Sequence, residues 1–384
     1  MSAPRRVLFL NSSAGRYGAD RQLALMASKL DPDRYRALVV LAMDGELRED
    51  LEAAGVEVLV RPLSVLRRAA MTPAGLARVG AELAKDAAAL ARLIRKRGIS
   101  VVHTNTSVTL GGAPAARLGR IPHVWHVREI YADFERTWPA YRRLLLTADA
   151  LPCESEATRA QFDGAAQAVV LNGCLSFLPE RAERGAARAA LDLPAGAFVC
   201  AVLGRINTWK GQDVLIRALA EDALAGSETI ALVAGDPWPG EERRLDELRA
   251  LAAGLGVAER VRFVGFRPDV ENVLGAADIV TVPSTQPDPL PNTALEGAAA
   301  GCCLVAANHG GLPEILTDGR TGRLVTPRDP AALAAAIAEL RADPELRERL
   351  GAAAAADVRE RFAPERLLEG TQALYDDLIG AGRP

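Results

Sequence analysis

Short runs of apolar, β-branched residues alternate with longer amphipathic stretches along the whole chain. This rhythm predicts parallel sheets covered by crossover helices. In the first half we expect a helix over Asp20–Lys29 and a long helix over Pro73–Arg97. The strands expected there, which complete one doubly wound unit, are Arg6–Leu10, Ala37–Leu41, Val56–Val60, Ser100–His103, His123–Val127, Ala150–Pro152 and Ala168–Leu171.

A second series of apolar runs predicts another unit of the same kind. Its expected strands are Phe198–Leu203, Ile230–Ala234, Val261–Val264, Ile279–Val282 and Cys302–Ala306. The Ala-rich tail from Pro330 to Gly380 predicts three consecutive helices. Pro330, Pro344 and Pro364 each stand near a helix start, where a missing N–H does no harm. The fold class is therefore α/β, with two Rossmann-like doubly wound parallel-sheet domains.

The boundary between the two halves is expected near residue 176. The segment Cys174–Pro194 is rich in Arg, Glu, Gly and Ala and carries no strand pattern. We therefore place an N-terminal domain at 1–175, a linker at 176–194, a C-terminal domain at 195–363 and a last helix at 364–384. Two domains also suit a chain of 384 residues, because single cores stop growing at about 250–300 residues.

Composition narrows the class of protein. Hydrophobic residues make up 49% and charged residues 25%, as in an ordinary soluble globular protein. A net charge of −3 gives no reason to expect nucleic-acid binding. The five cysteines form no CxxC pair and have no histidines at zinc spacing, so we expect buried free thiols. Arg5 and Arg6 precede an apolar run too short for a signal peptide or a membrane span, so we expect a cytoplasmic protein.

Polar loops that follow strands are the candidate sites, because ligands of doubly wound sheets bind beyond the carboxyl ends of strands. The loop 11–20 contains glycines and feeds a helix, although it does not match GxGxxG, and phosphate contact there is left open. In the loop 204–211, Arg205 can donate two parallel hydrogen bonds to phosphate oxygens, and Lys210 can add a positive charge at the start of the helix. This pair suits a diphosphate leaving group.

A third candidate loop, 283–291, contains Asp288 between prolines and ends where a helix is expected to begin near Asn292, a good N-cap residue. Glu296 lies on the early turns of that helix. The two carboxylates can accept hydrogen bonds from separate hydroxyl groups of a sugar nucleotide.

Four segments in fixed order carry a resemblance to a known family: GRINTWKG, VRFVGF, PSTQPDPLPNTALEGAAAGCCLVA and GGLPEILTDGRTGRLVTPRD. Together they resemble the retaining glycosyltransferases of the GT-B fold (glycosyltransferase group 1), which include many bacterial mannosyl- and glucosyltransferases. The resemblance covers most of the second half and is weaker in the first. It implies two Rossmann-like domains facing a cleft, with the last helix, 364–384, returning to the N-terminal domain.

The resemblance also implies roles for particular residues. Asp288 and Glu296 have the family's spacing of two acids with seven intervening residues, with Asp in place of the usual first Glu. Glu296 is expected to bind the ribose hydroxyls, and Asp288 is expected to bind the sugar hydroxyls. Arg205 and Lys210 are expected to bind the diphosphate. The edge Gly265–Arg267 is expected to meet the nucleobase. Further sugar-donor contacts are expected from Leu290, Asn292 and Thr293, whereas Pro291 replaces a common glycine and removes one backbone N–H.

In the first half, His126 resembles the family's histidine that faces the transferred sugar. Gly18 belongs to a loop that resembles the family's glycine loop and is expected to contact the sugar donor, although Tyr17 replaces the first glycine of that loop. The catalytic set expected is thus His126, Asp288, Arg205 and Lys210. The scheme needs no metal, no cofactor and no protein nucleophile. Asp31 and Asp33 resemble a metal-binding acid pair, but we interpret them as turn residues.

Alternatives remain open at this point. A nucleotide-sugar epimerase of the same fold and a non-catalytic sugar-nucleotide-binding module both compete, whereas a dehydrogenase is disfavoured because no GxGxxG is present. The acceptor is unidentified, and a lipid-linked sugar is one option. The basic run Leu93–Arg97, with Arg67 and Arg68, either touches anionic lipid at the inner membrane face or is a solvated helix end.

Overall fold

The computed structural model describes residues 3–67, 70–131, 137–238 and 240–381. The chain forms two compact units. The N-terminal unit consists of residues 1–176 together with the C-terminal segment from 364, and the C-terminal unit is 177–363. The last helix is therefore part of the N-terminal unit.

The N-terminal unit contains a parallel sheet in the order β3-β2-β1-β4-β5. A short parallel pair, β6-β7, continues it through bridges from Val124 to Ala150 and from Val127 to Cys153. The strands are β1 (Arg5–Asn11), β2 (Tyr35–Leu41), β3 (Glu57–Val60), β4 (Ile99–Thr104), β5 (His123–Trp125), β6 (Leu151–Cys153) and β7 (Ala168–Val170). The helices are α1 (Gly18–Lys29), α2 (Glu46–Ala53), α3 (Pro73–Arg97), α4 (Gly112–Gly119), α5 (Trp138–Leu145), α6 (Glu156–Arg159) and α15 (Pro364–Ala381).

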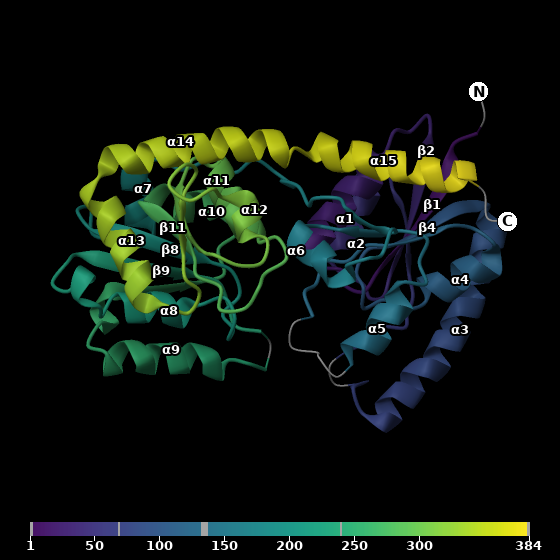
Figure 1. Ribbon diagram of the computed structural model, residues 1–384, viewed down its shortest axis with the longest axis horizontal. Helices are drawn as coiled ribbons and strands as arrows, with labels where there is room; N and C mark the ends of the chain where they lie inside the picture. Colours follow the sequence, from purple (N-terminus) through teal and green to yellow (C-terminus); the bar gives the residue numbers. More distant parts are fainter. Residues whose placement is uncertain (1–2, 68–69, 132–136, 239, 382–384) are drawn as a thin grey trace. The chain divides into compact units, whose positions relative to one another are not determined.

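Helices cover both faces of this sheet because alternate strand residues point to opposite faces. Leu8 and Leu10 of β1 pack on one face with Leu90 of α3 and other residues of α3 and α4. Phe9 packs on the other face with residues of α1 and α2 and with Tyr375 of α15 (Figure 1). The C-terminal helix thus supplies part of the core of the N-terminal unit.

The C-terminal unit contains a parallel sheet in the order β10-β9-β8-β11-β12-β13. Its strands are β8 (Phe198–Leu203), β9 (Thr229–Ala234), β10 (Val261–Gly265), β11 (Ile279–Val282), β12 (Cys303–Ala307) and β13 (Arg323–Val325). Its helices are α7 (Arg184–Ala190), α8 (Gln212–Ala218), α9 (Arg243–Gly254), α10 (Val270–Ala276), α11 (Asn292–Ala299), α12 (Leu312–Ile315), α13 (Pro330–Ala342) and α14 (Pro344–Arg361). The order changes direction after β8, so the carboxyl ends of β8 and β11 are neighbours.

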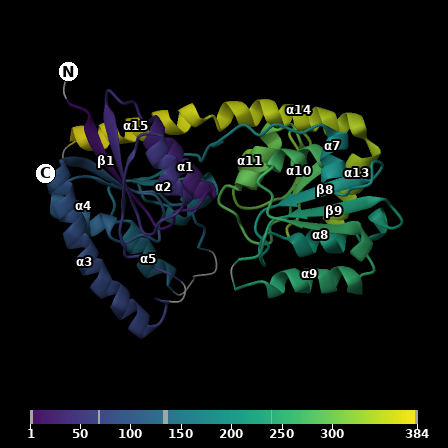
Figure 2. The same ribbon diagram turned by 180° about the vertical axis from the view of Figure 1, so that it is seen from behind.

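Helices also cover both faces of the second sheet (Figure 2). Cys200 and Val202 of β8 pack with residues of α8, α9 and α13, whereas Val199 and Ala201 pack with residues of α7 and α10. In α13 and α14 the prolines occupy the first helical turn, as predicted for Pro330 and Pro344. All five cysteines are free and buried, which confirms the prediction for the thiols.

The structure differs from the sequence-based predictions in two places. The segment 176–194, predicted as a linker, lies almost wholly inside the C-terminal unit and contains α7, which packs against α10. The strand β13 was not predicted, because only Leu324 and Val325 of its three residues are apolar and no apolar run marks it. Among the helices of the described ranges, none has the length and apolar character that a membrane crossing requires.

Candidate functional site

The loops after β8 and β11 meet at the carboxyl edge of the C-terminal sheet. The backbone N–H of Thr285 donates to Trp209 O over 2.7 Å, and its hydroxyl donates to Thr208 O. Gly211 has a φ of +75°, and a Cβ added there would lie 1.9 Å from Pro283 O. Only glycine allows this approach. The structure therefore brings together the two loops that the sequence singled out separately.

An ion pair joins two of the predicted site residues across these loops. Lys210 Nζ lies 2.5 Å from Asp288 Oδ2, and the two side chains are 22% and 13% exposed. Asn207 shapes the loop that carries the lysine, because its side-chain oxygen accepts hydrogen bonds from the N–H groups of Trp209 and Lys210. An ammonium group that keeps some exposure can exchange a carboxylate for a phosphate oxygen. The pair thus offers one cation and one acceptor in the same place.

A third loop, which follows β12, holds the backbone of Asp288. The N–H of Gly311 donates to Asp288 O over 2.8 Å, and a Cβ on Gly311 would lie 1.9 Å from Pro289 O. His309, in the loop after β12, has its Nε2 2.8 Å from Ser284 O, at the start of the loop that carries Asp288. The loop that carries Asp288 is therefore fixed from both sides.

Arg205 lies beside Trp238 at the carboxyl edge. Its guanidinium carbon is 4.1 Å from the centroid of the Trp238 ring, a cation–π distance. Burial lowers the pKa of Arg205, although the negative charge of Asp236 opposes this effect. Gln212 Nε2 donates to Arg205 O over 3.0 Å and fastens the loop to α8. The arginine is thus held by an aromatic face from the loop after β9.

The nucleobase edge predicted at 265–267 adjoins these loops. The N–H of Phe266 donates to Asp236 Oδ1 over 3.0 Å, and the Phe266 side chain is 65% exposed. The Arg267 guanidinium pairs with Asp269 at 2.5 Å. This ion pair and a hydrogen bond from Asn272 hold the pKa of Asp269 below its usual range. In the structure Arg267 is thus engaged by its neighbour, and the exposed group of this edge is Phe266.

The helix α11 carries the remaining predicted contacts of the C-terminal unit. It begins one residue earlier than expected, because Pro291 is the N-cap and Asn292 is the first helical residue. The prediction of Asn292 as N-cap is therefore wrong. Thr293 and Glu296 are half-buried on this helix, whereas Leu290 is 4% exposed and belongs to the interior.

In the N-terminal unit, the predicted glycine loop connects β1 to α1. Gly18 is the first residue of α1, and Tyr17 is the N-cap. The buried carboxylate of Asp20 accepts hydrogen bonds from Asn11 Nδ2 at 2.9 Å and from Ser13 Oγ at 2.6 Å. Burial raises the pKa of Asp20. These bonds hold the loop in place next to the carboxyl end of β1.

His126 follows β5 and is fully buried. Its Nδ1 lies 3.3 Å from His103 Nε2 and 3.4 Å from Arg128 Nη2, and its Nε2 has no hydrogen-bond partner among the described residues. Burial and the charge of Arg128 hold the pKa of His126 well below its ordinary value. The ring is thus held by its Nδ1 side, and a role of His126 toward the transferred sugar stays a prediction.

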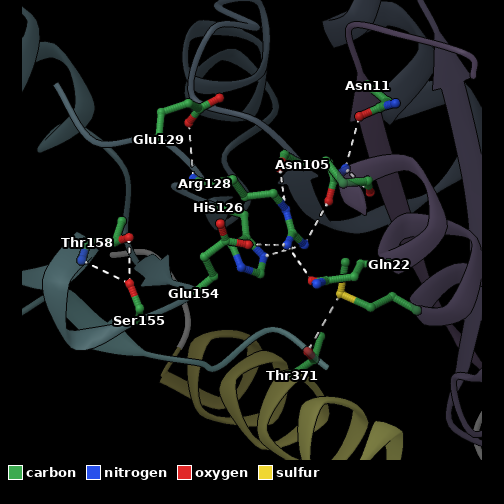
Figure 3. Close-up of polar contacts among 12 residues, drawn as sticks. Asn11, Gln22, Asn105, His126, Arg128, Glu129, Glu154, Ser155, Thr158 and Thr371 are labelled. Carbon is green, nitrogen blue, oxygen red and sulfur yellow. Dashed lines mark hydrogen bonds and ion pairs between the residues drawn. The ribbon is translucent and has the colours of Figure 1, made fainter. Parts of the chain in front are cut away.

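Arg128 organises a cluster that sequence reasoning missed (Figure 3). Its guanidinium donates to the backbone and side-chain oxygens of Asn105, to Gln22 Oε1, and to Glu154 Oε2 at 3.1 Å. Asn105 in turn donates to Asn11 Oδ1 over 2.9 Å. Arg128 and Glu154 each follow a predicted strand, which was the one signal that could have found them.

Two further expectations concern regions away from these clusters. In α3, Arg97 pairs with Glu57 at 2.7 Å, whereas Arg95 and Lys96 are exposed in the last turn; Arg68 lies outside the described residues. Asp31 lies in the turn between α1 and β2, where its Oδ1 accepts the N–H of Asp33, as expected for a turn residue.

These features define a class: two Rossmann-like α/β units, with polar loops gathered at the carboxyl edges of their sheets, form the GT-B fold. The C-terminal unit matches the family model described as glycosyl transferases group 1 over residues 183–357. The N-terminal unit matches the model described as glycosyltransferase family 4 over residues 17–169. Both units of the chain thus match family models of glycosyltransferases.

One solved structure resembles nearly the whole chain, and two curated relatives resemble about half of it. HepE of Anabaena, solved in complex with UDP and glucose, is 27% identical with a TM-score of 0.80, over 97% of this chain and 99% of HepE. A D-inositol 3-phosphate glycosyltransferase of Streptomyces scabiei is 38% identical over 50% of this chain and 44% of its own length. The lipopolysaccharide core biosynthesis glycosyltransferase LpsD of Rhizobium meliloti is 35% identical over 52% and 56%. The match thus spans about half the length of these curated relatives.

Proposed function

We propose that this protein transfers a hexosyl group from a nucleotide-diphosphate sugar to an acceptor hydroxyl, with retention of anomeric configuration. The observation that carries the proposal is the ion pair between Lys210 and Asp288, which joins two loops at the carboxyl edge of the sheet. Lys210 lies in the same loop as Arg205. HepE was solved with UDP-glucose, which makes a uridine-diphosphate sugar the first donor to test. The retaining outcome comes from the family resemblance.

The proposed roles follow from charge and position. Lys210 exchanges Asp288 for the diphosphate and, with Arg205, stabilises the negative charge that develops as the sugar leaves. Asp288 is then released to accept hydrogen bonds from sugar hydroxyls. Glu296 on α11 takes the ribose hydroxyls, and the edge 265–267 meets the base through its backbone. Because two cations supply the positive charge, we expect transfer to persist in the presence of a chelator.

The acceptor and the setting of the reaction are also proposed. The curated relatives are named for transfer to inositol 3-phosphate and for lipopolysaccharide core synthesis. These names support a role in the synthesis of cell-surface polysaccharide, glycolipid or another glycoconjugate. We propose that the protein works in the cytoplasm, and that contact with the inner face of the membrane occurs only if the acceptor is lipid-linked.

The test is a screen of the purified protein against a panel of nucleotide sugars. We expect thermal stabilisation by one sugar nucleotide, slow release of its nucleotide, and a released sugar whose anomeric configuration, followed by NMR, is unchanged at first appearance. Conversion of one nucleotide sugar into another would establish an epimerase instead. Stabilisation without any release in the presence of candidate acceptors would indicate a binding module, and a complete, metal-reversible loss with a chelator would overturn the metal-free scheme.

A further inference from the structure

A chain of buried side chains connects the C-terminal helix to His126. The hydroxyl of Tyr375 on α15 lies 2.6 Å from His103 Nδ1, and His103 Nε2 lies 3.3 Å from His126 Nδ1. All three side chains are fully buried. The three rings come from segments far apart in the sequence, since Tyr375 is 272 positions from His103.

Arg128 determines which ring nitrogens of His103 and His126 carry protons. Its Nη2 lies 3.4 Å from His126 Nδ1, and a guanidinium group can only donate hydrogen bonds. His126 Nδ1 must therefore accept, both from Arg128 and from His103 Nε2. It follows that His103 carries its proton on Nε2, and that its bare Nδ1 accepts the hydroxyl proton of Tyr375. His126, whose Nδ1 is bare, carries its own proton on Nε2.

Both histidines are held in the neutral form that this proton order requires. Burial and the charge of Arg128 lower the pKa of His103 and His126 well below the ordinary value. His123 adds to the lowering of the His103 pKa, and His103 adds to the lowering of the His126 pKa. A second proton on either ring would break a link, because a doubly protonated imidazole has no acceptor.

We infer that Tyr375, acting through His103 and together with Arg128, fixes His126 as the Nε2–H tautomer, so that His126 Nε2 can only donate a hydrogen bond to a ligand oxygen. Tyr375 and His103 are positioning residues in this arrangement. His126 Nε2 is buried and has no hydrogen-bond partner among the described residues. Its N–H is therefore the group that a ligand oxygen can accept from. That the acceptor is an oxygen of the transferred sugar rests on the proposed function.

The tautomer is measured without any substrate. The protein has four histidines. When it is labelled with 15N-histidine, long-range proton–nitrogen correlations distinguish the two neutral tautomers and the charged form of each ring. We expect His126 and His103 to be neutral with the proton on Nε2 at neutral pH. A proton on Nδ1 of His126, or a charged His126, would overturn the inference whatever the activity of the protein.

The role of Tyr375 is tested by Tyr375→Phe, which removes only the hydroxyl. We expect His103 to populate its Nδ1–H form, the tautomer of His126 to become mixed, and kcat to fall several-fold with KM nearly unchanged. Thr371→Val on the same helix is the matched control, because the Thr371 hydroxyl donates to Leu367 O within α15 and takes no part in the chain. An unchanged His126 tautomer in Tyr375→Phe would show that Arg128 alone suffices and would overturn the part assigned to α15.

Two variants of His126 separate this inference from the proposed function. His126→Gln can still donate from a side-chain N–H and is expected to retain part of the turnover, whereas His126→Leu is expected to lose it. If wild-type His126 has the predicted tautomer but no sugar is transferred from any nucleotide donor, the proposed function fails and the tautomer assignment stands. If transfer occurs and His126→Leu matches wild type, hydrogen-bond donation by Nε2 has no part in it.

Discussion

The polar clusters of the two units hold their charges in opposite ways. In the C-terminal unit, Lys210 and Asp288 lie on strand-end loops and are 22% and 13% exposed. In the N-terminal unit, the Arg128 and Glu154 side chains are 4% and 10% exposed, and Arg128 is surrounded by oxygens from several segments. The first pair can exchange one partner for a ligand, whereas the second is part of the interior. From this difference we expect the first cluster to bind a ligand and the second to position the side chains around it.

The largest effect we expect is on stability, from Arg128→Met. The change leaves the Glu154 carboxylate and the oxygens of Asn105 and Gln22 buried without their donor. Breaking a buried ion pair in this way costs about 3–5 kcal/mol. Urea unfolding followed by circular dichroism should therefore show a much lower midpoint for the transition of the N-terminal unit.

Arg48→Ala is the matched control for this loss. Arg48 pairs with Asp44 and Glu52, but all three side chains are exposed. An exposed pair contributes roughly 0–1 kcal/mol, so the midpoint should scarcely move. Equal losses in the two variants would mean that the buried cluster is no more important to folding than a surface ion pair, and the comparison above would fail.

The next effect concerns turnover, from Lys210→Ala. If Lys210 stabilises the charge of the leaving diphosphate, its loss should lower kcat by roughly 10²–10³-fold, the range found when one charge-stabilising group is removed. The Kd of the nucleotide sugar should change much less, because the interaction strengthens as the bond breaks. Single-turnover kinetics and titration calorimetry measure the two quantities separately.

Lys85→Ala, which removes an exposed lysine of α3, should match wild type in both measurements. A fall in affinity with unchanged kcat would assign Lys210 to ground-state binding only. Unchanged values of both constants would show that the ion pair with Asp288 is a feature of the fold and not of a site.

A smaller effect is expected on nucleotide binding from Glu296→Ala. Hydrogen bonds to a charged group contribute about 1.5–3 kcal/mol, so the Kd for UDP should rise by roughly 10–100-fold. Glu296→Gln keeps an acceptor oxygen and should lose less. A UDP analogue without ribose hydroxyls is the sharper probe, because its weaker binding should be the same in wild type and in Glu296→Ala. If the variant weakens this analogue as much as UDP, Glu296 does not bind the ribose.

The difference between the clusters also explains what could be predicted from the sequence. The helix Pro73–Arg97 was predicted at its exact bounds because a long periodic pattern begins with a proline and ends before Gly98, which adopts the left-handed conformation. Lys210 and Asp288 were each found from their places after strands. Their pairing, across 78 positions, depends on β8 and β11 being neighbours, which no local pattern specifies.

The N-terminal cluster was largely missed for the same physical reason. Arg128, Glu154 and Asn105 form no spaced motif, and each makes its contacts with residues more than 20 positions away. The burial of His126 likewise depends on Arg128 and on His103 from a neighbouring strand. The prediction of Asn292 as N-cap was wrong because Pro291, with a φ of −68°, already occupies the extended position that precedes the helix.

The smallest effect sharpens the comparison within the C-terminal unit, where Trp238 stacks on Arg205. A cation–π contact at a partly exposed site contributes about 0.5–1 kcal/mol, so Trp238→Leu should weaken UDP binding by roughly 2–5-fold. Trp238→Phe retains an aromatic face and should recover most of the affinity. Because Arg205 is assigned to the diphosphate, the binding of uridine should be the same in all three proteins. A loss that is as large for uridine as for UDP would place Trp238 at the base instead, and would remove the reason for treating the exposed loops as a site arranged around phosphate.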